Sequence, residues 1–421
     1  MRSWKPMVAG MLLLAIIAAC SPSSDSPHED HDAVEEKQEE ATEEQVDRRM
    51  LEGEAVTPPH ALREEASNHL QTLQTKNMTR LAENDPISFA IQLSQMGWPA
   101  THEQNQPNTV ILASVTDWRA SLASLTLVHH PNNGPMLYYD GTISDEVIQE
   151  IARLDPLGND QGTEILVIGD LPQAELDKLS AYTIAQITAD SAPEYGKLIE
   201  ESFIETIGDV PQAVLVGSLD EDAKGFTIPA AYWIAHMNES LLFVEDGAIP
   251  KETVEALEAR GGEAIIYLLG PEAIISENVA SELEAYGEVK RIEGDTPVEQ
   301  AIAFSSYKDE ATDFGWDITS PGHGLVFSST NDAELAIAAA PLAHLGKHSP
   351  LIWLDDGELT QPVYEYLAKL KPVFADDPTE GPYNHGYIIG DVDRVSYQVQ
   401  GVIDERLEIV SAHQSDEGHH H

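Results

Sequence analysis

Three stretches of the chain repeat one order of apolar segments, polar turns and helical patterns, and this repetition constrains the fold more than any other feature. The clearest mark of the repeat is an apolar segment that ends in Asp-Gly, at Asp140-Gly141, Asp246-Gly247 and Asp356-Gly357. The nearly equal intervals predict three copies of one structural unit, over residues 79–183, 184–288 and 289–412.

Each copy opens with a short strand, a polar turn and a helix, and the aspartates of these turns are the predicted helix N-caps: Asp85, Asp190 and Asp295. A buried strand that ends in serine follows, and then a small, alanine-rich helix, predicted over 118–128, 227–237 and 333–345. The Asp-Gly strand precedes a second helix, predicted over 144–154, 251–260 and 361–370, and a third strand closes the copy.

Apolar strands that alternate with helices of this length predict parallel βαβ units with helices on both faces of the sheet. The expected fold class is therefore α/β, with three tandem three-layer units of the flavodoxin or Rossmann kind. Residues 61–78, which place Leu62, Leu70 and Leu73 near helical spacing, predict one short amphipathic helix before the first unit.

The repeated pattern resembles the cell wall-binding type 2 repeat of Gram-positive surface proteins. The third copy carries the resemblance best, with Ala339-Ala340-Pro341-Leu342-Ala343, Ser349-Pro350-Leu351-Ile352 and Tyr387-Ile388-Ile389-Gly390. Gln186 replaces the repeat-opening arginine in the second copy, and Glu83 replaces its glycine in the first. The resemblance implies three repeats around a pseudo-threefold axis and non-covalent attachment to an anionic wall polymer or to peptidoglycan.

The N-terminus resembles a bacterial lipoprotein signal peptide over residues 1–19. Arg2 and Lys5 precede a short apolar run, which ends in Ile17-Ala18-Ala19-Cys20. The resemblance implies that Cys20 carries diacylglycerol and a palmitate chain, and so anchors the protein to the outer face of the cytoplasmic membrane. Cys20 is the single cysteine of the chain, which excludes disulfides.

Residues 20–60 are rich in Ser, Pro and acidic side chains and are expected to form an extended, disordered tether. Histidines and carboxylates at 28–32 could bind a metal weakly, but a solvated linker is the favoured interpretation. The tail at 413–421 ends in three histidines and is given no function.

The formal net charge of −50 excludes nucleic acid as a partner, because a surface of this sign repels polyanions. An acidic coat with so few lysines is typical of proteins from very salty media, so a halophilic source is expected; an ordinary acidic secreted protein is the alternative.

The cations of the repeat region nearest the family-like positions are the predicted contacts for an anionic polymer: Arg80, Arg119, Lys224, Arg291 and Lys347. Pairing with neighbouring carboxylates is the competing interpretation. The serines at the carboxyl ends of the buried strands are further ligand candidates: Ser114, Ser218 and Ser328. Asp117, Asp220 and Asp332, which follow these strands, are interpreted as helix N-caps.

Histidines follow the alanine-rich helices in all three copies, at His129-His130, His236 and His344. They could form a metal or acid–base set if the axis gathers them, although interaction with the helix C-termini is the favoured interpretation.

The sequence contains none of the common nucleophile, phosphate-loop, dinucleotide or zinc-protease motifs, so we expect neither catalysis nor a cofactor. The predicted function is a membrane-anchored surface lipoprotein that binds cell-wall polymer through three repeats. A lipoprotein that captures a solute or metal for uptake or sensing is the alternative. The sequence does not specify an oligomeric state.

Overall fold

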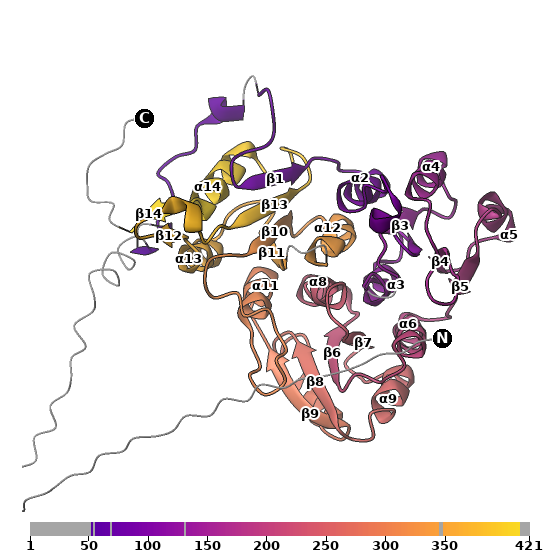
Figure 1. Ribbon diagram of the computed structural model, residues 1–421. Helices are drawn as coiled ribbons and strands as arrows, with labels where there is room; N and C mark the ends of the chain where they lie inside the picture. The colour runs from indigo at the N-terminus through magenta and orange to yellow at the C-terminus, as the bar shows by residue number, and fades with distance from the viewer. Residues whose placement is uncertain (1–51, 54, 68–69, 130–131, 345–347, 413–421) are drawn as a thin grey trace, which may run out of the picture. The chain divides into compact units, whose positions relative to one another are not determined.

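The structure is a computed structural model that describes residues 52–412, except residue 54 and residues 68–69, 130–131 and 345–347 (Figure 1). The predicted signal peptide, Cys20, the predicted tether up to residue 51 and the histidine tail lie outside the described residues. None of the described helices is long and apolar enough to cross a membrane.

Three four-stranded parallel sheets form the framework, and each has the same strand order. The first sheet has the order β3-β2-β4-β5, with β2 at Val110–Ser114, β3 at Met136–Tyr139, β4 at Ile165–Ile168 and β5 at Ile184–Ile187. The second has the order β7-β6-β8-β9, with β6 at Ala213–Ser218, β7 at Ser240–Val244, β8 at Ala264–Leu269 and β9 at Gly287–Ile292.

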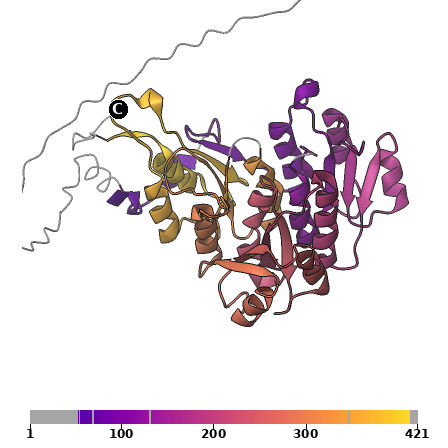
Figure 2. The same cartoon turned by 60° about the horizontal axis from the view of Figure 1, so that its bottom comes forward.

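The third sheet contains strands from both ends of the described chain. It has the order β11-β10-β13-β1, with β10 at Gly324–Ser329, β11 at Leu351–Leu354, β13 at His385–Ile389 and β1 at Met78–Leu81. Strand β1 pairs with β13 in parallel, with Arg80 opposite Ile388 (Figures 1 and 2). The first strand of the repeat region therefore completes the sheet of the last repeat.

The sheets are offset from the sequence repeats by one strand. The opening strands of the second and third copies, β5 and β9, pair with β4 and β8 of the preceding copy. In the same way β1, the opening strand of the first copy, pairs with β13 of the third copy. The three units therefore form a closed cycle.

The opening helices begin where the polar turns predict, at α2 (Pro86–Gly97), α6 (Ala192–Ile207) and α11 (Pro297–Ser306). Asp85 caps α2 and accepts a hydrogen bond from the Ser88 amide, as predicted. The predictions for Asp190 and Asp295 were wrong, because Ser191 and Thr296 hold the cap positions. A proline in each first turn fixes where the helix starts, which places the cap on the residue immediately before this turn.

The alanine-rich helices are shorter than predicted and end in tight turns. They comprise α3 (Trp118–Ser124) with η3 (Leu125–Leu127), α7 (Lys224–Thr227) with α8 (Ala230–Ile234), and α12 (Ala333–Ala339) with η6 (Ala340–Ala343). Pro229 separates α7 from α8, because proline lacks the amide that a continuous helix requires. We call these alanine-rich helices and the short turns that continue them the axial helices. They contact one another in all three pairings, α3 with α12, α8 with η3 and α8 with η6. Their small side chains allow this close approach, and the contacts agree with the expected pseudo-threefold arrangement.

Each opening helix joins two units. Helix α2 packs on β3 and on α12, α6 packs on β7 and α3, and α11 packs on β11 and α7. One hydrophobic cluster consequently runs through all three repeats, and a second, smaller cluster lies on sheet 2 around Val216, Leu257 and Leu268.

The remaining helices complete the three-layer units (Figure 1). The second helix of each copy matches its prediction closely, at α4 (Asp145–Leu154), α9 (Lys251–Glu258) and α13 (Gln361–Lys369). The helices that follow the third strands are α5 (Gln173–Leu176) with η4 (Asp177–Leu179), α10 (Glu277–Leu283) and α14 (Tyr397–Leu407). The small elements are η2 (Glu103–Asn105), η5 (Glu221–Ala223), η7 (Pro378–Glu380) and the two-stranded sheet of β12 (Val373–Phe374) with β14 (Val410–Ser411).

The predicted helix at 61–78 is not present. The described part of this segment has one short turn, η1 (Glu64–Ser67), and then runs without helix to β1. The segment instead lies along α14, where Gln398 Nε2 donates to the Arg63 carbonyl at 3.3 Å and Gln400 Nε2 to the Leu73 carbonyl at 2.8 Å. Leu62 stays exposed, so the leucine spacing did not reflect a buried helical face.

Candidate functional site

The repeat-opening cations hold the units together. Arg80 lies on β1 and is only 4% exposed. Its guanidinium donates to the carbonyls of Gly390, Asp391 and Val395 at 2.7–2.9 Å and to Gln400 Oε1 at 2.8 Å. Burial lowers the pKa of Arg80 to about 10, which leaves the group charged at neutral pH.

Arg291 and Gln186 occupy the same place at the other two junctions. Arg291 donates to the carbonyls of Gly270 and Ile275 at 2.8 and 3.0 Å and pairs with Glu277 at 2.9 Å. Gln186 donates to the Gly169 carbonyl at 2.8 Å. In each case one acceptor is the carbonyl of the glycine that follows the third strand. These glycines have positive φ angles, which other residues rarely adopt. We call Arg80, Gln186 and Arg291 the junction residues.

Arg119 and Lys224 lie where the N-terminal ends of the axial helices meet. Arg119 donates to the Leu219 carbonyl at 2.9 Å and pairs with Glu221 at 2.8 Å, so it crosses from the first repeat to the second. Lys224 pairs with Glu334 at 2.8 Å, which crosses from the second repeat to the third.

The Trp118 ring contacts both of these cations. Its Nε1 donates to Glu221 Oε1 at 3.0 Å, and the Arg119 and Lys224 cations lie 4.8 and 5.4 Å from the ring centroid. The Trp118 and Arg119 contacts lower the pKa of Glu221. We call the set Trp118, Arg119, Glu221, Lys224 and Glu334 the axial clasp.

The predicted polymer contacts are therefore all bound by protein oxygens, as far as the described residues show. Arg80, Arg119, Lys224 and Arg291 each have such partners, and Lys347 lies outside the described residues. Sequence reasoning had left pairing with carboxylates open, but it did not identify the backbone carbonyls that Arg80 and Arg291 bind.

The strand-end serines form local turns at the carboxyl edges of the sheets. Ser114 Oγ and Ser218 Oγ each accept a hydrogen bond from the amide two residues further along. In the third unit Ser329 makes this contact, to the Asn331 amide, so Ser329 is the structural equivalent of the other two. Ser328 Oγ is buried and has no hydrogen-bond partner among the described residues.

The aspartates after these strands have three different roles. Asp117 caps α3 and accepts from the Ala120 amide, as predicted. Asp220 holds the N-cap position of η5, but its side chain accepts from the Asp246 amide rather than from an amide of that helix. Asp332 pairs with Arg394 at 2.8 Å, and burial raises the pKa of Asp332 although Arg394 opposes the shift.

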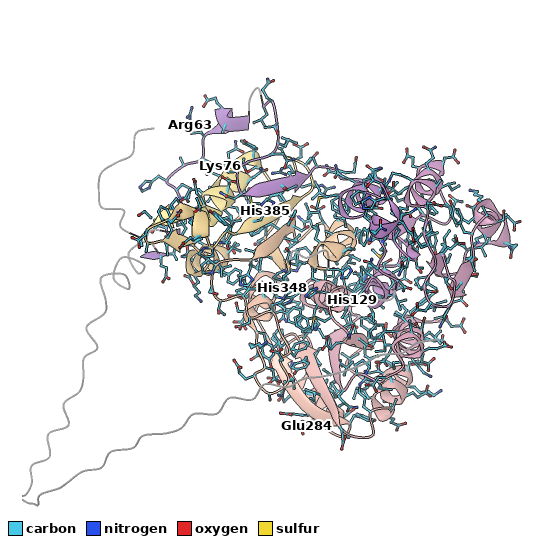
Figure 3. All side chains as sticks on the ribbon, in the orientation of Figure 1. Arg63, Lys76, His129, Glu284, His348 and His385 are labelled. Atoms are coloured by element: carbon cyan, nitrogen blue, oxygen red, sulfur yellow. The ribbon has the colours of Figure 1, made fainter. Side chains whose placement is uncertain are left out.

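Histidines from all three repeats gather at the other end of the axial helices. The His129 and His344 rings lie 4.6 Å apart, and those of His236 and His348 lie 5.1 Å apart. Figure 3 labels His129 and His348, from the first and the third repeat. His344 Nε2 also lies 3.1 Å from Asn133 Oδ1. The axis therefore gathers the imidazoles that the sequence singled out, except His130, which lies outside the described residues.

The segment between α11 and β10 adds residues that the sequence did not single out. The buried Trp316 ring stacks on His236 at 5.6 Å, and His323 lies 6.1 Å from His348. We call His129, His236, His323, His344 and His348, with Trp316, the histidine cluster. Within the described chain no group of three or more His, Cys, Asp or Glu residues is arranged to hold a metal ion.

The fold defines a class of α/β proteins in which three sheets form a closed cycle around axial helices. No protein-family model matches the chain, and no curated protein matches it. Among solved structures, Cwp6 from Clostridium difficile is similar with a TM-score of 0.64 and 14% identity, over 82% of this chain and 50% of Cwp6. Cwp8 from Clostridium difficile is similar with a TM-score of 0.61 and 16% identity, over 79% of this chain and 52% of Cwp8.

Both similar structures are cell wall proteins. The chain matches about half the length of each, and at these identities the comparison establishes the shared fold.

Proposed function

We propose that this protein attaches non-covalently to the cell wall through its three α/β repeats and catalyses no reaction. The observation that carries the proposal is the fold that the three repeats share with two cell wall proteins. The cyclic junctions support it, because they present the three units as one body on which a polymer could bind across more than one repeat.

We further propose that Cys20 is lipidated and that the residues after it form a tether between the membrane and the repeats. The tether is shorter than the predicted 20–60, because Val56 and Thr57 already contact α13 and α14. The proposal rests on the lipoprotein-like sequence before Cys20 and on the acidic composition after it. Attachment at both ends would act in concert, because a tether turns the second binding event into an intramolecular one.

The charge of the protein makes the salt dependence of wall binding diagnostic. Most proteins that bind polyanions lose affinity as salt rises, because salt screens the attraction. Here the formal charge is −50, and the described candidate cations have protein partners. If the wall polymer is anionic, added salt mainly screens repulsion, and we expect binding to increase with salt.

Co-sedimentation with purified walls tests the proposal. The full chain carries Cys20→Ala, so that lipid does not contribute to pelleting. We expect pelleting that rises with salt and is lost once the anionic polymers are stripped. Pelleting that survives stripping would favour peptidoglycan as the ligand. No pelleting at any salt concentration would contradict wall attachment and favour solute capture.

Two variants of equal charge locate the binding surface. Lys224→Gln removes a cation of the axial clasp, whereas Lys251→Gln removes one from the surface of α9, where it pairs with Glu255 and is 80% exposed. If the polymer binds over the axial clasp, the Lys224 variant pellets several-fold less than the Lys251 variant. Equal pelleting would remove the axial clasp from the binding surface.

A further inference from the structure

The histidine cluster is the one place where ionisable groups of a single kind from all three repeats are in ring contact within the described chain. His129 follows η3, His236 follows α8, and His344 follows η6, so each ring extends from a different axial helix. Contacts among these rings are therefore contacts between repeats. Any charge that develops on them acts on the interface itself.

The surroundings of the cluster favour uncharged rings. Trp316, which is 2% exposed, stacks on His236 with an interplanar angle of 11° and meets His348 at 4.9 Å. His236 Nδ1 is buried and has no hydrogen-bond partner among the described residues. Protonation of this ring would thus put a positive charge in a buried place, with no acceptor for the Nδ1 proton and with other imidazoles beside it.

We propose that the histidine cluster is a pH-sensitive lock between the three repeats: neutral imidazoles pack the ends of the axial helices together, and their protonation loosens this end. The lock is separate from the axial clasp, which joins the opposite ends of the same helices through pairs of opposite charge.

The direction of the pH effect follows from the burial of the rings. Burial lowers the pKa of His236 from 6.5 to about 4, with His348, His129 and His344 adding to the shift, and it lowers the pKa of His344 to about 4. Burial also lowers the pKa values of His348 and His323. Unfolded chains bind these protons more readily, so stability is unaffected above about pH 6.5 and falls between pH 6.5 and 4.

The other charged groups around the cluster modify this effect. Lys308, on the segment between α11 and β10, opposes protonation of His348, whereas Asp317 on the same segment favours protonation of His323. Glu239, which follows α8 and accepts from Trp233 Nε1 at 2.9 Å, has a pKa raised by burial. Its protonation stabilises the folded protein in acid, so the lock must be measured as a difference between variants.

Thermal unfolding of the full chain provides this difference. His236→Phe keeps a flat ring for stacking on Trp316 but cannot take a proton. The matched control is His102→Phe, at an exposed histidine that caps η2, far along the chain from the cluster. Between pH 7.5 and 5.0 we expect the Tm of wild type and of the control to fall by about 3 °C or more relative to that of His236→Phe. Parallel curves for all three proteins would overturn the proposal.

Hydrogen exchange covers the case in which the phenylalanine variant does not fold. In wild type, exchange corrected for its intrinsic pH dependence should increase at pH 5.0 for the residues around 124–129, 233–237 and 340–344, but not at 117–121 beside the axial clasp. His344→Gln, which can keep the contact to Asn133 without a titrating ring, should reduce the increase. Uniform exchange along the axial helices would mean general acid destabilisation and contradict a lock.

Discussion

The junction at Arg80 and the junction at Gln186 occupy equivalent places in the cycle but use different numbers of hydrogen bonds. Arg80 is buried and donates to three carbonyls and one side-chain oxygen. Gln186 is exposed and donates to the Gly169 carbonyl. The two junctions also differ in how the chain itself connects their strands.

At Gln186 the paired strands β4 and β5 are joined by a short connection through α5, so they cannot separate far. At Arg80 the paired strands β1 and β13 come from opposite ends of the described chain, and non-covalent contacts alone close the sheet. Closing so long a loop costs more conformational entropy. The additional contacts around β1 offset this cost, including Asn77 to Asp404 at 2.7 Å.

Arg80→Ala tests this difference most strongly. The substitution leaves four buried or partly buried acceptors without their donor, so we expect the free energy of unfolding to fall by about 3 to 5 kcal/mol. Urea denaturation measures the loss. Arg80→Lys should recover only part of it, because an ammonium cannot reach the same acceptors with a planar fork. A loss below about 1 kcal/mol would show that β1 does not depend on Arg80.

Arg291→Ala is expected to have an intermediate effect. Its two carbonyl contacts resemble those of Arg80, but its carboxylate partner Glu277 is 68% exposed, and the connection through α10 keeps β9 near β8. We expect a loss of about 1 to 2 kcal/mol in the same urea experiment. Glu277→Gln serves as the control for the ion pair and should cost under about 0.5 kcal/mol.

Gln186→Ala should have the smallest loss of the three. One partly buried hydrogen bond from an exposed side chain is removed, so we expect about 0.5 kcal/mol or less. A loss as large as that of Arg291→Ala would contradict the view that chain connection replaces hydrogen bonds at this junction.

Gln186→Arg sharpens the comparison by adding the family-like residue. In the other two units the arginine donates a second hydrogen bond to a backbone carbonyl, of Ile275 or of Val395. These carbonyls belong to the turns that precede α10 and α14. In the first unit α5 starts at Gln173, and this turn is absent from the described residues. We expect no gain in stability beyond about 0.5 kcal/mol; a clear gain would mean that a second acceptor is available.

Local patterns in the sequence predicted the strands and outer helices well. The second helices of the three copies, α4, α9 and α13, matched their predicted ranges, since their apolar spacing and the polar turns before them are local signals. Local signals also misled: the leucines of 61–78 suggested a helix, yet this segment is held by side chains of α14.

Sheet membership and side-chain partners depended on contacts that are distant in the chain. Motif alignment correctly grouped Arg80, Gln186 and Arg291, but it could not show that each strand pairs with the preceding copy. The same limit applied to Arg119, whose partners lie about a hundred residues away. Trp316 escaped notice because its segment has no counterpart among the repeated motifs.

The pairing of β1 with β13 also determines how the repeats would bear mechanical load. Near the point where the chain enters β1, Thr79 Oγ1 lies 2.9 Å from His385 Nε2 on β13. Tension on the chain before Val56 is borne first by the contacts of residues 56–73 with α13 and α14, and then by β1, Arg80 and their partners on β13 and α14. The lifetime of the protein under a steady pull is then governed by the rate at which one short strand detaches, not by the equilibrium stability of the whole fold.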